Sequence, residues 1–130
     1  MLTRIETVLG QITTLNAIFE RRPRQFMFGT KNYGDIPGTH NPADNDPFDV
    51  FAPGTAVKLE VGVPYRIATL YGVFVLRNGN HKICVGVRGV RVDVCKAREE
   101  VRRYCKRYMA TTGARGTWVS LHPAFAGIVI

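Results

Sequence analysis

The sequence predicts a small, closed β-barrel with one flanking helix, and three patterns support this fold class. Residues 57–76 hold two apolar, β-branched runs, and the first alternates apolar with polar side chains, as a half-buried strand does. Asn78-Gly79 then gives a hairpin signal, because both residue types tolerate the positive φ of a tight turn. Residues 96–109 carry one apolar stripe at helical spacing. Short strands joined by hairpins and followed by a helix indicate a small barrel.

The size and charge of the chain limit its class and its partners. With 130 residues it is expected to form a single domain, 1–130, large enough to bury a core. The formal net charge of +8 favours anionic partners: nucleic acid, phosphates or an acidic surface of another protein. No apolar stretch is long enough to span a bilayer, and the first residues lack the pattern of a secretory signal. We therefore expect an intracellular or particle-associated protein without a membrane span.

The elements of the first two thirds of the chain can be placed in order. Residues 1–20 are rich in β-branched side chains, which favour a strand over a helix. Residues 28–54 are rich in glycine and proline, which predicts a long loop of the kind that usually carries function. Strands are expected at 57–61 and 65–76. After the hairpin turn, residues 82–87 return as the partner strand.

The last third begins with the helix. Its apolar stripe consists of Val101, Tyr104, Cys105, Tyr108 and Met109. Gly113 is expected to end the helix, residues 117–121 to form a last strand, and residues 123–130 to form an apolar tail that can pack on a neighbour. The three cysteines form no close pair in the sequence, so we expect buried, reduced thiols at Cys84, Cys95 and Cys105.

The segment from Asp44 to Asp49 is the strongest functional signal in the chain. Three carboxylates, Asp44, Asp46 and Asp49, lie within six residues around Pro47. Asp44 and Asp46 point to the same side of an extended segment, and the proline can turn Asp49 back toward them. Carboxylate oxygens are the ligands that Mg²⁺ prefers. The alternative is a turn-rich loop in which these side chains only cap backbone N–H groups.

Several motifs together resemble the signature region of soluble family I inorganic pyrophosphatases. They are Phe28, Asn32-Tyr33-Gly34, Asp44-Asn45-Asp46-Pro47-Phe48-Asp49-Val50 and Pro53-Gly54. Weaker similarity continues through 70–75, 82–85, 99–108 and 118–119, so it spans most of the chain. The resemblance implies an OB-like, five-stranded closed barrel with flanking helices. It also implies Mg²⁺-dependent hydrolysis of pyrophosphate to phosphate.

The resemblance assigns roles to individual side chains. It implies that Asp44, Asp46 and Asp49 are catalytic: they ligate metal and help to activate the attacking water. Asp44 and Asp49 would be metal ligands, with Asn80 offering a neutral carbonyl oxygen to a cation. The side chains that would contact the substrate are Tyr33, Lys82, Tyr108 and Arg21. Arg22 is an alternative to Arg21, and Arg4 and Glu6 match the family's N-terminal Lys and Glu pair only weakly.

The departures from the family pattern are equally specific. Its hairpin turn carries two further metal-binding aspartates, whereas residues 77–81 here read Arg-Asn-Gly-Asn-His. Met109 stands where the family has a lysine, and Gly29 where it has a tyrosine. Each lost ligand charge weakens the binding of metal ions on which multi-metal hydrolysis depends. We therefore expect reduced or lost catalysis and reuse as a structural or assembly subunit, with other subunits or a homo-oligomer as partners. A minimal, active pyrophosphatase is the alternative.

The basic surface leaves a third hypothesis open. Residues 96–107 hold six cations, and the hairpin region adds Arg77, Lys82, Arg88 and Arg91. Such a surface can bind the phosphate backbone of nucleic acid without sequence specificity, and barrels of OB type also stack bases on aromatic side chains. Tyr65, Tyr71 and Phe74 are candidates for stacking, although alternation along a strand favours a core position for them.

Overall fold

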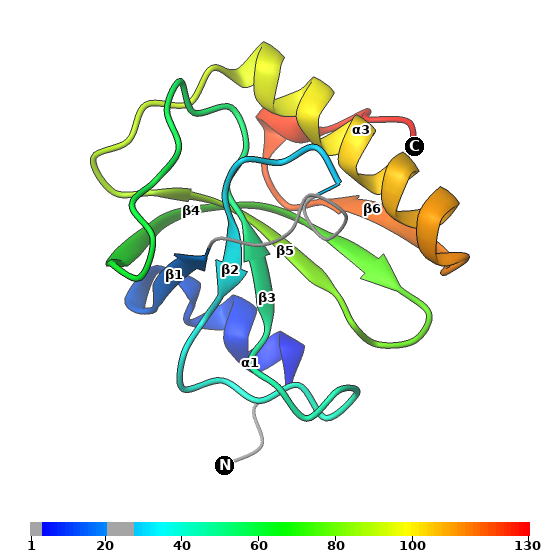
Figure 1. Cartoon of the computed structure of the whole chain (residues 1–130), viewed down its shortest axis with the longest axis horizontal. Coiled ribbons are helices and arrows are strands. Elements are labelled where there is room, and N and C mark those ends of the chain that lie inside the picture. Colours follow the sequence, from blue (N-terminus) through cyan, green and yellow to red (C-terminus); the bar gives the residue numbers. More distant parts are fainter. Residues whose placement is uncertain (1–3, 21–27) are drawn as a thin grey trace.

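The computed structural model describes residues 4–20 and 28–130. Two helices, α1 (Ile5–Gly10) and α3 (Val94–Thr112), and two short 3-10 segments, η1 (Ile12–Thr14) and η2 (Pro123–Phe125), accompany a sheet (Figure 1). The strands of the sheet are β1 (Asn16–Glu20), β2 (Tyr33–Asp35), β3 (Asp49–Phe51), β4 (Pro64–Leu76), β5 (Lys82–Val87) and β6 (Gly116–Ser120). None of the helices among these residues is long and apolar enough to cross a bilayer.

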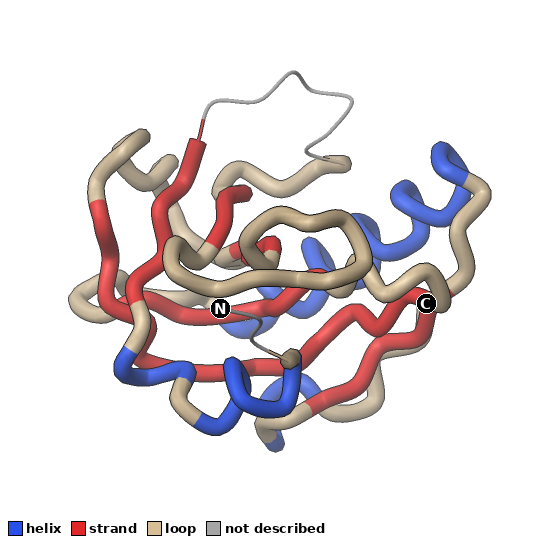
Figure 2. Tube along the Cα trace, turned by 90° about the horizontal axis from the view of Figure 1, so that it is seen from below, coloured by secondary structure: helices blue, strands red, loops and turns tan. Residues whose placement is uncertain are grey.

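Five of the strands close into a barrel. The strand order is β1-β2-β3-β5-β4, and β4 pairs back with β1. β3 and β5 run parallel, while the other pairs are antiparallel. The long strand β4 pairs with β1 at its start and with β6 at its end, so β6 extends the sheet beyond the barrel (Figure 2). The predicted mainly β fold, a five-stranded closed barrel with a flanking helix, is confirmed.

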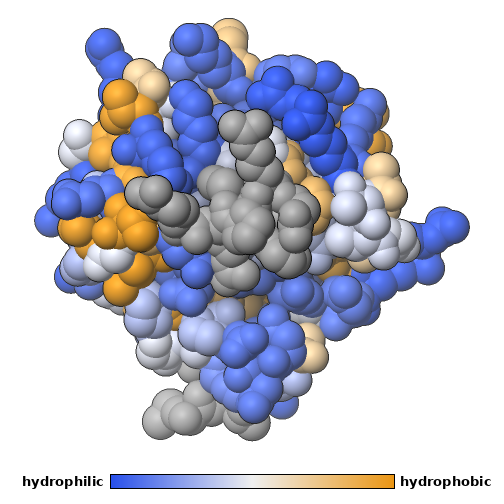
Figure 3. Space-filling view, viewed as in Figure 1, coloured by the Kyte–Doolittle hydropathy of each residue, from blue (hydrophilic) through white to orange (hydrophobic). Residues whose placement is uncertain are grey.

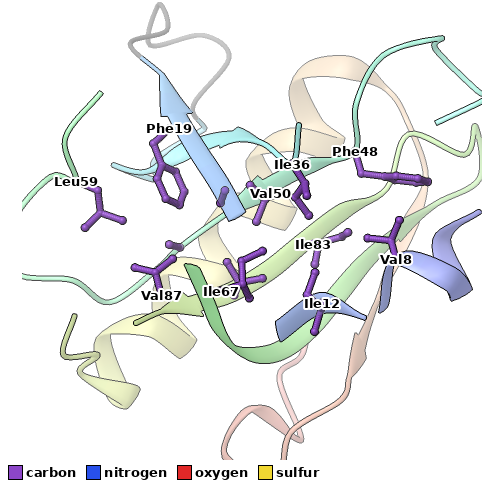
Figure 4. Packing of buried hydrophobic residues seen from close by; sticks show 13 residues of the cluster. Val8, Ile12, Phe19, Ile36, Phe48, Val50, Leu59, Ile67, Ile83 and Val87 are labelled. Carbon is purple, nitrogen blue, oxygen red and sulfur yellow. The ribbon is translucent and has the colours of Figure 1, made fainter. Parts of the chain in front are cut away.

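The sheet separates two apolar cores. The first fills the barrel and includes Phe19, Val50 and Ile83 (Figure 4). The second lies between the sheet and α3 and includes Phe51 and Cys84. Consecutive residues of β3 and β5 therefore serve opposite faces, as the period of two in a strand requires. The alternation of faces therefore decides which side chains of β3 and β5 point into the barrel and which point toward α3.

The start of the chain differs from its prediction. Residues 5–10 form α1 rather than a strand, and only 16–20 are extended as β1. Val8 and Ile12 lie four residues apart, so both can face the barrel, where both are buried. Burial of this apolar pair outweighs the modest β preference of the neighbouring side chains.

Residues 57–61 do not form the predicted strand. The fully buried Asn32 accepts a hydrogen bond from the Leu59 backbone N–H at 2.7 Å, and its amide donates to Thr55 Oγ1. Leu59 is buried, but Val57 is 68% and Val61 41% exposed, so the alternating pattern identifies only one buried position correctly. The backbone of this segment is bonded to a side chain instead of to another strand.

The hairpin is confirmed, but its turn is not of type I′. The Gly79 N–H donates to the Leu76 carbonyl, and Gly79 has φ +85° while Asn78 keeps a negative φ. A turn followed by a left-handed glycine also suits a hairpin. The β4–β5 ladder shifts register between Ile67 and Thr69 and again between Leu70 and Gly72, so the extra residues lie in β4.

The predicted helix and last strand are confirmed. α3 is longer than 96–109, and Gly113 ends it in the left-handed conformation with φ +74°. The tail packs on its own chain, because Phe125 is fully buried and stacks on Tyr71 at 4.2 Å between ring centroids. The expectation for the cysteines was wrong at Cys95, which is exposed in the first turn of α3, whereas the other two are buried.

Candidate functional site

Seven of the eight side chains implicated by the sequence line one pocket of about 440 Å³. They are Tyr33, Asp44, Asp46, Asp49, Asn80, Lys82 and Tyr108. Four segments contribute them: β2, the loop that leads into β3, the turn that leads into β5, and the last turns of α3. The eighth residue, Arg21, and its alternative, Arg22, lie outside the described residues. Arg4 and Glu6 are exposed near α1 and are not among the lining residues.

An ion pair forms the inner wall of the pocket. Asp49 begins β3 and Lys82 begins β5, and the parallel register places them opposite each other. Lys82 Nζ lies 2.5 Å from Asp49 Oδ2, and the side chains are 3% and 14% exposed. A buried ammonium needs such a partner, because an isolated charge is costly to remove from water. Lys82 is therefore a positive charge fixed in place at the pocket.

Two tyrosines surround this ammonium. Lys82 Nζ donates to the Tyr33 hydroxyl at 3.1 Å and lies 5.7 Å from the centre of that ring. It also lies 5.4 Å from the centre of the Tyr108 ring. Burial raises the pKa of Tyr108, and the carboxylates of Asp49 and Asp44 raise it further. Tyr108 thus keeps its proton at neutral pH and can donate a hydrogen bond to an oxyanion in the pocket.

The acidic loop is attached to the hairpin turn. Asn41 Nδ2 donates to the Gly79 carbonyl at 3.0 Å, and the Asn41 N–H donates to the Asp46 carbonyl at 2.7 Å. Asn45 adopts a left-handed conformation with φ +63°, which a short polar side chain tolerates. These contacts bring the acidic loop beside Asn80, although 31 or more residues separate them in the sequence.

The three aspartates differ in their surroundings. Asp44 and Asp46 are exposed, whereas Asp49 is largely buried. Asp44 Oδ1 accepts the Asp46 N–H at 3.1 Å, which is the capping role that the alternative interpretation of this loop predicts. Asp44 therefore has a local structural role as well as a place at the pocket.

Two buried polar atoms at or beside this site have no hydrogen-bond partner within the described chain. They are Asn80 Oδ1 and the Tyr104 hydroxyl. Burial raises the pKa of Tyr104 well above its usual value, and the nearby Tyr33, Tyr108 and Asp49 add to this. Buried polar groups in proteins are almost always paired, so an orphan atom requires an explanation. Asn80 lines the pocket, so a ligand there can donate to its Oδ1, whereas Tyr104 is fully buried in the second core and is not among the lining residues.

The oxygen atoms that line the pocket are of the kind that binds a hard cation, but within the described chain they do not converge on one point. Asp44, Asp49 and Asn80 offer the oxygen ligands that Mg²⁺ prefers, and Asn80 Oδ1 is an acceptor without a donor. Across residues 4–20 and 28–130, no three acidic, histidine or cysteine side chains converge into a metal-binding group. Asp49 Oδ2 is already paired with Lys82. A cation here would be held by few protein ligands and by the oxygens of an anionic ligand.

The sequence analysis missed two residues that line this pocket, and it included motif residues that do not reach the pocket. Thr111 and Thr112 also line the pocket. They follow Tyr108 by three and four residues on α3, so helical spacing could have identified them. In the Asn32-Tyr33-Gly34 motif only Tyr33 reaches the pocket. A Cβ on Gly34 would lie 2.0 Å from the Ile18 carbonyl oxygen, so this glycine serves close strand packing.

A second, basic pocket lies at the start of α3. It has a volume of about 730 Å³, and its cations are Lys31, Arg91, Lys96 and Arg103. Among the described residues, its lining includes three acidic side chains and no aromatic one. Tyr71 and Phe74 are core residues, and Tyr65 packs against the barrel core. The aromatic platform considered for base stacking is therefore not at this surface, although hydrophilic residues cover much of the face around α3 (Figure 3).

Comparison with known proteins gives no relative. No protein-family model, no curated protein and no solved structure matches the chain.

Proposed function

We propose that this chain is a divergent relative of inorganic pyrophosphatases that binds phosphate or pyrophosphate together with Mg²⁺. Its hydrolytic activity is reduced or lost, and it acts as a structural or assembly subunit. One observation carries this proposal: seven side chains expected from a pyrophosphatase-like motif, on four separate segments, line a single pocket. Chance similarity in the acidic loop alone would not bring Tyr33, Lys82 and Tyr108 to the same place.

The chain's own residues suit an anionic ligand. The Lys82 ammonium supplies a fixed charge, and the Tyr33 and Tyr108 hydroxyls supply donors close to it. Asp46, exposed at the acidic loop and lining the pocket, would take a proton from a water molecule in this proposal. A bound Mg²⁺ would be held by Asp44, Asp49 and Asn80 and would polarise the phosphate oxygens. Arg21 remains a substrate-binding proposal from the resemblance.

Reduced catalysis follows from the shortage of metal ligands. The turn at residues 77–81 has no carboxylate. Asp49 shares its charge with Lys82, and one Asp44 oxygen is bonded to backbone. Each tenfold loss in rate corresponds to about 1.4 kcal/mol of transition-state stabilisation. The loss of two metal-binding carboxylates is on the order of several kcal/mol, which is several powers of ten in rate.

Two alternatives share parts of this structure. A minimal, active pyrophosphatase would use the same pocket with Asp46 as the base. A nucleic-acid-binding barrel would instead use the basic pocket around Lys96 and Arg103, through phosphate contacts rather than stacking. Retention of RNA or DNA on a filter at low salt, lost in Lys96→Ala/Arg103→Ala, would favour this second alternative.

Calorimetric titration with pyrophosphate, with and without Mg²⁺, tests the proposal. We expect binding that strengthens when Mg²⁺ is present and weakens by about tenfold or more in Lys82→Met, because a fixed charge contributes at least ~1.4 kcal/mol in a partly buried pocket. Lys106→Met is the matched control, since Lys106 is exposed on α3 outside the pocket. No binding to the wild-type chain, or equal losses in the two variants, would refute the proposed site.

A further inference from the structure

Among residues 4–20 and 28–130, no hydrogen-bond partner is found for the backbone groups on the outer edge of β6. β6 is the last strand in the sheet order, and within the described chain it pairs only with β4. Arg115 C=O accepts from Arg77 N–H, and Leu121 N–H donates to Tyr71 C=O. Because hydrogen-bonded pairs alternate in an antiparallel ladder, the odd-numbered residues of this strand bond to β4.

The even-numbered residues consequently point their backbone groups away from β4. These residues are Gly116, Trp118 and Ser120. Within the described chain, none of their N–H or C=O groups takes part in a hydrogen bond outside the ladder. Trp118 uses only its indole Nε1, which donates to the Phe125 carbonyl. The edge therefore presents three N–H and three C=O groups in alternation, which is the template that an added strand needs.

This edge lacks the features that normally prevent pairing. Proteins protect free edges with charged residues, proline or bulges. Residues 116–121 read Gly-Thr-Trp-Val-Ser-Leu, with no charge and no proline. Five consecutive residue pairs join β6 to β4 without a register shift, whereas the β4–β5 ladder is shifted twice. Val119 and Leu121 are 42% and 47% exposed beside the free edge.

We propose that the β6 edge pairs antiparallel with the β6 edge of a second copy of this chain, about a two-fold axis at Trp118. This register pairs Trp118 with its symmetry mate and Gly116 with Ser120, so all six edge groups become bonded. Thr117 lies opposite Val119 of the second copy, and cross-strand pairs of β-branched residues are favourable. An uncharged strand is also the part of a +8 chain that two copies can share with least repulsion.

Light scattering of the full chain at high micromolar concentration tests the pairing. We expect twice the 14.5 kDa chain mass for the wild type and a single chain mass for Val119→Lys. Val57→Lys is the matched control, because Val57 is 68% exposed in a loop outside β6, and it should remain a dimer. A monomeric wild type, including one whose edge is used by a different protein, would overturn the proposal. So would a dimer that persists in Val119→Lys.

A cross-link keeps the proposal testable if Val119→Lys fails to fold. Thr117 and Val119 of the two copies form non-hydrogen-bonded pairs in the proposed register, where the side chains come close. Under oxidation, Thr117→Cys/Val119→Cys should therefore give a covalent dimer, whereas Val57→Cys should give no more than the wild type with its exposed Cys95. A double variant that cross-links no better than Val57→Cys would exclude this register.

Discussion

Asp49→Asn is expected to destabilise the fold because it removes the carboxylate that compensates the Lys82 ammonium. The Lys82 side chain is 3% exposed and its Nζ lies 2.5 Å from Asp49 Oδ2. Removing one partner of a buried ion pair costs about 3–5 kcal/mol. The asparagine amide still offers an oxygen acceptor, and Tyr33 still accepts from Lys82, so we expect about 2–4 kcal/mol.

Lys82→Met should cost less. It keeps much of the apolar stem, and Asp49, at 14% exposure, can regain contact with water. The double variant Lys82→Met/Asp49→Asn should cost less than the two single changes together, by about 1–3 kcal/mol, because neither charge is then left uncompensated. Urea denaturation followed by circular dichroism measures all four proteins. Additive losses would show that the pair is not coupled and would refute this reasoning.

Three further predictions concern packing and pH. Gly34→Ala should cost roughly 3 kcal/mol or more in thermal or urea melts because of its backbone clash, whereas Gly10→Ala, which meets no atom within 4 Å, should be neutral or stabilising. Burial lowers the pKa of His81 from 6.5, and its Nδ1 accepts the Leu76 N–H. The stability of the wild type should therefore fall as pH drops below about 6.5, whereas that of His81→Leu should not. Equal slopes of stability against pH in the two proteins would contradict this. Burial raises the pKa of Glu100 from 4.5, so its unfavourable charge develops as pH rises through the raised value. Glu100→Gln should therefore gain stability relative to the wild type between pH 4.5 and 7. A stability difference between the two proteins that does not change with pH would contradict this.

The barrel could be predicted because local patterns and global packing agree along most of the chain. The apolar, β-branched runs of β4 and β5, the turn at Asn78-Gly79 and the apolar stripe on α3 each favour the structure that forms there. The prediction failed at α1, at residues 57–61, and at β2 and β3, which lie within the predicted loop 28–54. α1 and residues 57–61 are placed by long-range contacts with the barrel and with Asn32, which no local window contains.

The candidate site could be predicted as a set of residues but not as a geometry. Short-range spacing identified the acidic loop, and family resemblance identified Tyr33, Lys82 and Tyr108. The ion pair between Lys82 and Asp49 depends on the parallel register of β3 and β5, and a sequence separation of 33 does not reveal this register. The link from Asn41 to Gly79 is likewise a tertiary contact. These contacts decide which ligand atoms remain available to a cation.

Two glycines of the pyrophosphatase-like motifs are explained by packing rather than by chemistry. Gly34 and Gly54 belong to the stretch that resembles a catalytic signature, yet each is required by close packing: a Cβ on Gly54 would lie 2.6 Å from the Ala97 Cβ. Close packing alone therefore accounts for these two glycines. Function must be argued from the side chains that reach the pocket.

Phosphate release from pyrophosphate in the presence of Mg²⁺ tests the central claim most directly. We predict slow release by the wild type, little further loss in Asp46→Asn, and a gain in Asn80→Asp, which restores a carboxylate to the turn beside the acidic loop. Rapid release by the wild type that Asp46→Asn abolishes would contradict the account and would identify a working enzyme.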